Sequence, residues 1–289
     1  MTSDGVRYSI VIPTLDRPQR LRACLEGVAA QDLPPAQYET IVVDDGSRIP
    51  VADVLPDAVE RARARVIRQP NAGPGAARNR AAAEARGELL AFLDDDCVPD
   101  PGWLATLGRK AAAHPGTGFG GRTVNTLTGN AYSRTSHVLI DYLYEYYNTG
   151  KADYPMFTTN NLALPRREFE RIGGFDTRFT RAGGEDRELC LRWVRSGGKL
   201  RYAPEAVVHH FHPLGPRSFL KLHFTYGRGA AQYHRVRGSP TIPEPLSFYR
   251  DLLLYPWRQR LPGRAGMSVL LALCQVANAA GYVWERRAP

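Results

Sequence analysis

The chain has 289 residues, of which 43% are hydrophobic and 23% are charged. This balance predicts a globular protein of one large domain or two small ones and argues against a disordered chain. The formal net charge of +9 suits nucleotide phosphates, lipid headgroups or nucleic acid, but a solvated basic surface would give the same value. The four cysteines have no zinc-knuckle or Cys-x-x-Cys spacing, so we expect reduced thiols in an intracellular protein without a signal peptide.

Strands and helices alternate through the first third of the chain. Short apolar runs predict strands at 8–13, 39–43, 66–68 and 88–93. Helical spacing of apolar residues predicts helices at 19–31, 52–65 and 75–85. Continuous apolar strands between helices indicate a parallel sheet that is covered on both faces.

After Pro101 the pattern is less regular. Helices are predicted at 103–113, 132–147, 184–196 and 216–236, and strands at 160–164 and 206–210. Residues 126–154 contain no motif that can be placed. The prolines at 240, 243 and 245 predict a linker before the C-terminal segment.

The C-terminal segment 267–283 is mostly apolar, but it is shorter than the roughly 20 residues of a membrane span. It is therefore interpreted as a docked or interfacial helix. Flanking arginines, among them Arg264 and Arg286, could hold it against anionic headgroups. A helix packed on its own domain is an equally good interpretation.

Acidic residues follow two of the predicted strands. In parallel sheets, ligands bind outside the carboxyl ends of the strands. Asp94, Asp95 and Asp96 stand at one such end, where adjacent carboxylates repel one another unless a cation or an arginine offsets them. This favours a Mg or Mn site over a simple acidic turn. Asp45, in an Asp-Asp-Gly-Ser turn, could accept a hydrogen bond from a nucleobase N–H group, which would favour uracil or thymine.

Three further groups of residues are weaker evidence for a functional site when each is taken alone. A Gly-Pro-Gly loop opens the helix that carries Arg78, and helix starts favour phosphate. Glu185 and Asp186 follow a Gly-Gly pair, where an acid either caps the helix or acts as a general base. Three histidines, at 209, 210 and 212, follow a predicted strand; they are as often structural as metal-binding.

Six motifs, taken in order, resemble the family 2 inverting glycosyltransferases of the GT-A fold. They are VIPTLDRP (11–18), VVDDGS (42–47), NAGPGAARN (71–79), FLDDDC (92–97), NNLALPRREFERIGGFD (160–176) and GGEDREL (183–189). Each motif is moderately specific, but their joint order and spacing are highly specific. The resemblance covers roughly residues 7–235.

The resemblance implies a role for each matching position. On the donor side, Thr14 and Asp45 would contact the nucleobase next to Pro13, and Arg78 would lie near the phosphates. The acidic run would provide the Asp-x-Asp motif, with Asp96 as the direct metal ligand, Asp94 supporting it, and Asp95 in the donor site without a defined role. Asn160 would shape the sugar and acceptor pocket. Asp186 would be the catalytic base with Glu185 beside it, and His210 would be a further metal ligand, although His209 and His212 are open alternatives.

The expected fold class is α/β: a Rossmann-like GT-A fold with a mostly parallel central sheet flanked by helices and a helical C-terminal extension. The glycosyltransferase domain would span 1–238, with a donor half at 1–122 and an acceptor half at 123–238, followed by a linker and helical segment at 239–289. The expected reaction moves a sugar from a nucleotide donor, in the first place a UDP-sugar, to a saccharide, lipid-linked or small-molecule acceptor. Mn or Mg would be the cofactor, and we expect the protein in the cytoplasm or at the inner face of the cell membrane.

Two other functions compete with this one. A nucleotidyltransferase would share the sheet, the acidic strand end and the metal, but it would place a basic Gly-rich signature close after the first strand, where this chain has 13–18 (PTLDRP). A basic protein that binds nucleic acid or a membrane surface without catalysis would explain the arginines at 61–68 and 216–237. No recognised nucleic-acid module occurs there, and so we expect no nucleic-acid partner.

Overall fold

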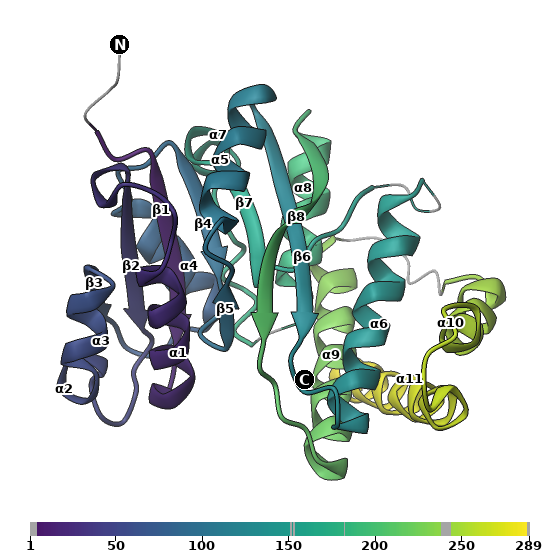
Figure 1. Ribbon diagram of the computed structural model, residues 1–289. Helices are drawn as coiled ribbons and strands as arrows, with labels where there is room; N and C mark the ends of the chain where they lie inside the picture. The colour runs from purple at the N-terminus through teal and green to yellow at the C-terminus, as the bar shows by residue number, and fades with distance from the viewer. Residues whose placement is uncertain (1–4, 151, 153, 182, 238–243, 288–289) are drawn as a thin grey trace.

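The computed structural model describes residues 5–150, 152, 154–181, 183–237 and 244–287 (Figure 1). Within these residues, one sheet has the strand order β3-β2-β1-β4-β7-β6-β8-β5. Its strands are β1 (Tyr8–Thr14), β2 (Tyr38–Asp44), β3 (Ala64–Arg68), β4 (Leu89–Leu93), β5 (Cys97–Pro99), β6 (Thr117–Asn125), β7 (Asn161–Pro165) and β8 (Lys199–His210). The helices are α1 (Pro18–Ala29), α2 (Val51–Val54), α3 (Pro56–Arg61), α4 (Pro74–Ala83), α5 (Trp103–Ala113), α6 (Ala131–Asn148), α7 (Arg166–Arg171), α8 (Glu185–Arg195), α9 (Pro216–Arg237), α10 (Leu246–Arg258) and α11 (Arg264–Arg287), with a 3-10 turn η1 at Pro35–Gln37.

The first four strands form the parallel half of the sheet. β1 pairs in parallel with both β2 and β4, and β2 pairs in parallel with β3. Successive side chains of a strand point to opposite faces, so Ile10 and Ile12 pack with the helix α1 while Val11 packs with α4. The sheet is thus covered on both faces, as predicted, and the carboxyl ends of β1, β2 and β4 meet at one edge.

The other half of the sheet is mixed. β7 pairs antiparallel with β4 and β6, β8 pairs in parallel with β6, and β5 pairs antiparallel with β8. The expected α/β fold with a mostly parallel sheet and a C-terminal helical extension is confirmed. The strand β6 was not predicted, because its glycines are unusual in strands. Gly118 and Gly120 leave space that the side chains of Leu164 and Phe157 occupy.

Two predicted boundaries are corrected. The single helix predicted at 52–65 is two short helices, α2 and α3, because Pro56 lacks the N–H group that a continuous helix would need. β8 begins at Lys199 rather than at Ala206. Of the predicted linker, Pro240 and Pro243 lie outside the described residues, whereas Pro245 immediately precedes α10.

The helices α6, α9, α10 and α11 form a group beside the mixed half of the sheet, on the side away from β3 (Figure 1). They share a hydrophobic core of their own, which includes Leu139, Phe219, Leu252 and Leu271. α9 and α11 cross at very close range, since a Cβ atom at Gly227 would clash with the Asn278 carbonyl group. This packing fixes α9, and through it one wall of the site described next.

Candidate active site

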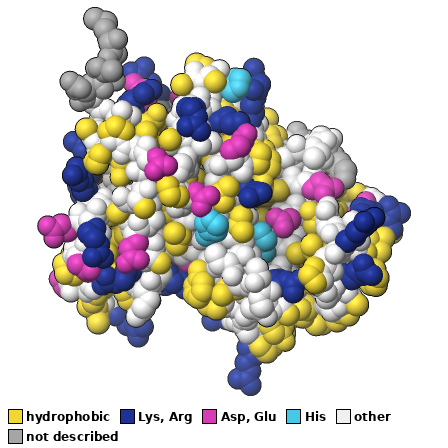
Figure 2. Space-filling model, in the orientation of Figure 1, with side chains coloured by type: hydrophobic (Ala, Val, Ile, Leu, Met, Phe, Trp, Pro, Cys, Tyr) yellow, Lys and Arg dark blue, Asp and Glu magenta, His cyan; other side chains and the backbone are white. Residues whose placement is uncertain are grey.

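A cleft of about 810 Å³ lies between the carboxyl ends of the parallel strands and the helices α6, α8 and α9. Its lining includes Arg17, Asp94 and Asp96, which follow strands, and Arg78 of α4. In Figure 2, histidine side chains gather near the middle of the face shown. The cleft therefore brings together residues that are far apart in the sequence.

Asp96 lies at the centre of a group of charges at the bottom of the cleft. Its side chain is 4% exposed, and its carboxylate contacts Arg20 at 3.1 Å, His210 at 3.2 Å and His212 at 3.7 Å. Burial opposes ionisation, but the hydrogen bond to His210 and the positive charges of His210 and Arg17 lower the pKa of Asp96 to about 2. Asp96 is consequently an anion at neutral pH.

Asp96, His210 and His212 together could hold a metal ion. One ligand atom from each lies within 4.8 Å of the others. Burial, together with the nearby His210, lowers the pKa of His212 to about 4, so its imidazole is neutral and able to coordinate a cation. His209 points elsewhere and contacts Asp100 at 2.7 Å. The sequence did not decide which of the three histidines binds a metal, and the structure places two of them, His210 and His212, next to Asp96. The contact of His212 with Asp96 could not be predicted from the sequence.

The other two aspartates of the run have different partners. Asp95 is buried, accepts a hydrogen bond from the Thr14 hydroxyl at 2.7 Å and contacts Arg17 at 3.2 Å. Burial raises the pKa of Asp95 to about 6, although the Arg17 charge lowers it. Asp94 is 32% exposed and pairs with Arg78 at 2.6 Å, outside the group around Asp96. Asp95 thus joins β1 to β4, while Asp94 faces the cleft.

Arg78 connects the two acidic sides of the cleft. Its Nη2 atom binds Asp94, and its Nη1 atom lies 3.8 Å from Glu185 at the start of α8. The side chain is 4% exposed, and its Nε and Nη1 atoms have no hydrogen-bond partner within the described part of the chain. Buried donors without partners are costly, which makes this guanidinium a candidate ligand for an anion.

Glu185 and Asp186 begin α8 and have different environments. The Glu185 carboxylate accepts from the N–H group of Gly183 at 2.6 Å, and its pKa rises to about 7 because of burial and the charge of Asp186. Asp186 is half-buried, lines the cleft and accepts from the N–H group of Arg187 at 2.8 Å. Burial also raises the pKa of Asp186. Asp186 is better placed to meet a substrate, because Glu185 is turned into the Gly-Gly turn.

An aromatic cluster fixes Arg187, the residue after Asp186. Its guanidinium lies over the ring of Tyr233 at 4.7 Å and that of Tyr147 at 5.3 Å, and it donates to the Tyr154 hydroxyl at 2.9 Å. These tyrosines come from α6, α9 and the segment before β7. The start of α8 is therefore tied to both helices of the cleft wall, which sequence patterns did not predict.

Asp45 organises the loop after β3. Its carboxylate accepts from Gln69 at 2.7 Å and from the N–H groups of Ala72 at 3.0 Å and Gly73 at 2.9 Å. The neighbouring Asp44 is fully buried and accepts from the N–H groups of Ser47 and Val51. Asp45 thus holds the loop that leads into the helix of Arg78, and its contact with a nucleobase stays a prediction.

Asn160 lines the cleft from the mixed half of the sheet. Its Oδ1 atom accepts from the Thr158 hydroxyl at 2.7 Å, and from that of Thr123 at 3.3 Å. Pro13, at the end of β1, does not line the cleft itself. Arg17 and Arg20 are residues that the sequence interpretation missed, although their position just after β1 was a usable signal.

Comparison with known families decides the class of protein. The profile described as "Glycosyl transferase family 2" matches residues 9–173, and one described as "N-terminal domain of galactosyltransferase" matches 143–213. The chain belongs to glycosyltransferase family 2. It is an enzyme, a glycosyltransferase, and the nucleotidyltransferase and non-catalytic alternatives are set aside.

Three curated relatives have transferase names. The chain is 28% identical to "Glycosyltransferase AglE" of Haloferax volcanii over 80% of its own length and 75% of the relative's. It is 32% identical to "Validoxylamine A glucosyltransferase" of Streptomyces hygroscopicus subsp. limoneus over 66% of its length, and 30% identical to "Pre-mycofactocin glycosyltransferase" of Mycobacterium tuberculosis over 83%. It spans only 48% and 50% of the latter two.

Solved structures show the same GT-A fold. The mannosyltransferase PcManGT of Pyrobaculum calidifontis, in complex with GDP-Man and Mn²⁺, superposes with a TM-score of 0.70 at 17% identity, covering 98% of this chain and 88% of that one. S. aureus TarS 1–349, in complex with UDP-GlcNAc, gives 0.56 at 15% identity, covering 97% and 91%. At these identities the likeness concerns the fold alone.

Proposed function

We propose that this glycosyltransferase takes its sugar from a nucleoside diphosphate donor, uses a divalent cation, and inverts the anomeric configuration with Asp186 as general base. The observation that carries this proposal is a single cleft with Asp96, His210 and His212 on one side and Asp186 on the other. Arg78 lies between them and contacts an acid on each side. Transfer from a diphosphate needs both of these functions close together.

The donor would bind over the ends of β1, β2 and β4. Arg78 would contact the diphosphate, since it is a buried cation with donors that lack partners. A carboxylate has about four lone-pair positions, and the buried Asp45 uses three of them on the loop after β3. The remaining one could accept the N–H group of a uracil ring, and we therefore propose a UDP-sugar. The comparison structures were solved with GDP-Man and UDP-GlcNAc, which supports a nucleotide-sugar donor in general.

The candidate metal ligands around Asp96 favour one kind of divalent cation over another. One carboxylate and two imidazoles suit Mn²⁺ better than Mg²⁺, which prefers an all-oxygen environment. A bound divalent ion would supply positive charge for the leaving diphosphate. Asp94 is a poorer ligand candidate than Asp96, because it is paired with Arg78.

Asp186 would accept the proton of the acceptor hydroxyl. As that oxygen bonds to the anomeric carbon, the bond from this carbon to the phosphate oxygen breaks, and the nucleoside diphosphate leaves with the electron pair. A single displacement of this kind converts an α-linked donor into a β-glycoside. The raised pKa of Asp186 suits proton transfer near neutral pH.

The acceptor would occupy the side of the cleft between α6 and α9. This side is lined by apolar side chains that include Leu139, Ile140, Leu143 and Leu222. Such a lining suits an acceptor that carries an apolar part next to the reacting hydroxyl group.

Nucleotide release from a panel of sugar nucleotides tests the proposal. The panel is UDP-Glc, UDP-GlcNAc, UDP-Gal and GDP-Man, each with Mn²⁺, Mg²⁺ or EDTA, and products are followed by mass spectrometry and anomeric NMR. We expect UDP release with Mn²⁺ at lower metal concentration than with Mg²⁺, loss in EDTA, and inverted product. Full activity in EDTA would contradict the metal site, and a retained anomeric configuration would contradict the role of Asp186.

A further inference from the structure

The solvent-facing side of α11 is apolar along its length. Between 265 and 284, every residue that the structure places at the surface is Ala, Gly, Val, Leu or Trp. Val269, Val276 and Trp284 are 61%, 68% and 62% exposed. The stripe extends about 30 Å, at about 1.5 Å per residue. A helix packed on its own domain normally shows polar residues on this side.

The exposed apolar side chains are concentrated in this region. Of the 13 large hydrophobic side chains exposed among the described residues, eight lie in α10 and α11, including Leu246 and Trp257 of α10. Such a concentration differs from the scattered surface hydrophobics of ordinary proteins and marks an interaction surface. We call it the α10–α11 surface.

The exposed charged residues of this surface are all arginines. Residues 244–287 contain six arginines, all exposed: Arg250, Arg258, Arg260, Arg264, Arg286 and Arg287. The three acids of this segment are already paired: Glu285 with Arg228, Asp251 with Arg258, and Glu244 with Tyr147 and Arg187. Arg250 and Arg258 share the charge of Asp251, so most of the positive charge of this segment is left to meet an external anionic surface. Figure 2 shows Lys and Arg side chains among hydrophobic ones at the lower right, where Figure 1 places α10.

Exposed tryptophans and arginines occur together near both ends of the stripe. Trp257 lies against the Arg264 guanidinium at 4.6 Å, close to the start of α11, and Trp284 is followed by Arg286 and Arg287 at its end. Tryptophan prefers the headgroup level of a bilayer, where arginine meets lipid phosphate. An apolar stripe with such ends has the pattern of a helix that lies in a membrane interface.

We propose that the α10–α11 surface binds an anionic lipid membrane, with α11 lying along the interface. Among the described residues, α11 alone is long and apolar enough to cross a membrane by length and composition. Spanning would require it to leave α9, to which it is joined by the backbone contacts of Gly227 and Gly281. A second copy of the chain is a poor occupant, because two arginine rims would meet.

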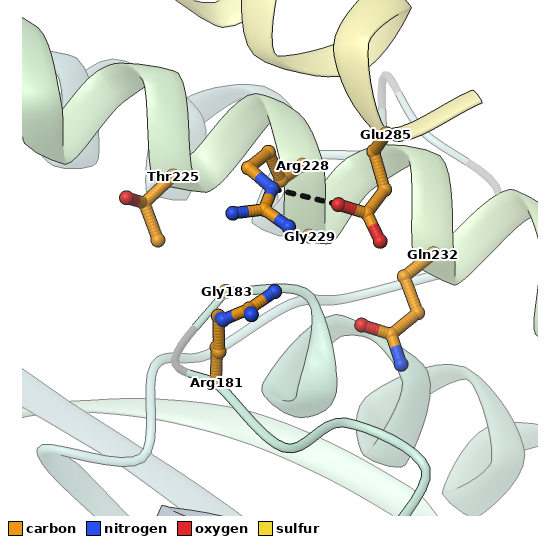
Figure 3. A pocket seen from close by; sticks show the side chains of 7 residues that line it. All are labelled: Arg181, Gly183, Thr225, Arg228, Gly229, Gln232 and Glu285. Atoms are coloured by element: carbon orange, nitrogen blue, oxygen red, sulfur yellow. Dashed lines mark hydrogen bonds and ion pairs between the residues drawn. The ribbon is translucent and has the colours of Figure 1, made fainter. Parts of the chain in front are cut away.

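This surface is close to the reaction site. Asn278 of α11 lines the cleft, and the exposed Val276 lies on the opposite face of the same helix, about one helix diameter of 10 Å away. Figure 3 shows Glu285 of α11 paired with Arg228 of α9, beside Arg181 and Gly183 of the loop that leads to α8. If the proposed glycosyl transfer holds, a membrane-bound enzyme would have its cleft next to the lipid surface. A cleft next to a membrane suits acceptors that are linked to lipids.

Tryptophan fluorescence of the full chain provides the first test. Of the four tryptophans, Trp103 and Trp193 are buried, whereas Trp257 and Trp284 are 46% and 62% exposed. Vesicles with 30% phosphatidylglycerol in phosphatidylcholine should shift the emission to shorter wavelength, and brominated lipid should quench it. Pure phosphatidylcholine vesicles should have little effect. An unchanged spectrum with the anionic vesicles would overturn the proposal.

Vesicle flotation of variants locates the contact. Val269→Asp with Val276→Asp should reduce binding at least tenfold, because it places carboxylates on the apolar stripe. Ile49→Asp, at an equally exposed position (61%) on the opposite half of the molecule, should bind as the unmodified chain does. Thermal melts should confirm that both variants fold. Unchanged vesicle binding by the α11 variant would reject the assignment. The assignment would also be rejected if the unmodified chain bound no vesicles but formed a dimer, and the α11 variant were a monomer.

The charge contribution is tested separately. Arg264→Gln with Arg287→Gln should weaken binding to anionic vesicles by about tenfold or more, since each arginine near such a surface contributes about fivefold. The matched control is Arg167→Gln with Arg195→Gln, two exposed arginines outside the surface. Equal losses in both pairs would show a non-specific charge effect and overturn the location. All these measurements use no donor or metal, so they succeed or fail independently of the proposed reaction.

Discussion

The proposed donor side and the proposed acceptor side of the cleft hold their side chains by different means. On the donor side, polar groups are already paired with one another: Thr14 with Asp95 at 2.7 Å, and Arg78 with Asp94 at 2.6 Å. On the acceptor side, apolar side chains of α6 and α9 form the lining, and glycine contacts hold α9 in place.

The first arrangement holds polar groups in fixed positions, whereas the second allows the shape of the cleft to vary. Paired polar groups fix positions to within a hydrogen-bond length, which suits the diphosphate of the proposed donor. Apolar walls can change shape by substitution at small cost, which suits acceptors that differ between enzymes. Asp186 stands where the two sides meet, and substitutions on either side should therefore have separable effects.

The largest effect is expected from Asp186→Asn. The amide keeps the size of the side chain but cannot take a proton, so kcat should fall about a hundredfold or more. Donor affinity, measured by calorimetry with Mn²⁺, should change little. A kcat within a few-fold of the unmodified enzyme would remove Asp186 from the role of base.

Gly227→Ala should lower the stability of the protein by disturbing the helix packing on the acceptor side. The added methyl group would meet the carbonyl of Asn278, and we expect the free energy of unfolding to fall by about 1–3 kcal/mol. Gly266→Ala is the matched control in α11, because nothing lies within 4 Å of the added atom. It should leave stability unchanged or raise it by about 1 kcal/mol. Denaturant titration measures both, and equal values would contradict the close contact of α9 and α11.

The histidines provide a third test, confined to the donor side. His212→Gln should lower the apparent Mn²⁺ affinity about tenfold or more, because it removes one of three candidate ligands. His209→Gln is the control, since His209 contacts Asp100 rather than Asp96. Metal titrations of donor binding distinguish them. Equal behaviour of the two variants would reject the assignment of His212.

The pH dependence of kcat should show the smallest effect. A general base works when deprotonated, and burial raises the pKa of Asp186, so kcat should fall with decreasing pH through a midpoint above the ordinary pKa of an aspartate. Asp94 raises this pKa further, while Arg78 and the N–H group of Arg187 lower it. Glu185→Gln should leave the midpoint almost unchanged, with at most a few-fold change in the plateau, because a pKa of about 7 keeps Glu185 largely protonated in the acidic range where kcat falls. A large shift of the midpoint in this variant would contradict this order of titration.

The sequence was sufficient for the parallel half of the sheet and for the positions of its acids. Apolar runs such as β1 and β4 are local patterns, and the rule for strand ends placed Asp94 and Asp96 at a common edge. β6 was missed because its glycines make room for Phe157 and Leu164, which belong to other segments. The grouping of Asp96 with two histidines and the tyrosine cluster around Arg187 could not be predicted either. Both bring together residues that are far apart in the sequence, and no periodic pattern of residues indicates such contacts.

The contact of α9 with the turn before α8 has a consequence for how this chain can change length. A Cβ atom at Gly229 would collide with the backbone at Gly183, next to the two acids that start α8. One residue inserted earlier in α9 would rotate this position by about 100° and put a side chain against that turn. We infer that insertions in the first half of α9 are not tolerated, whereas the mostly exposed connection of α10 to α11 at 259–263 tolerates added residues better.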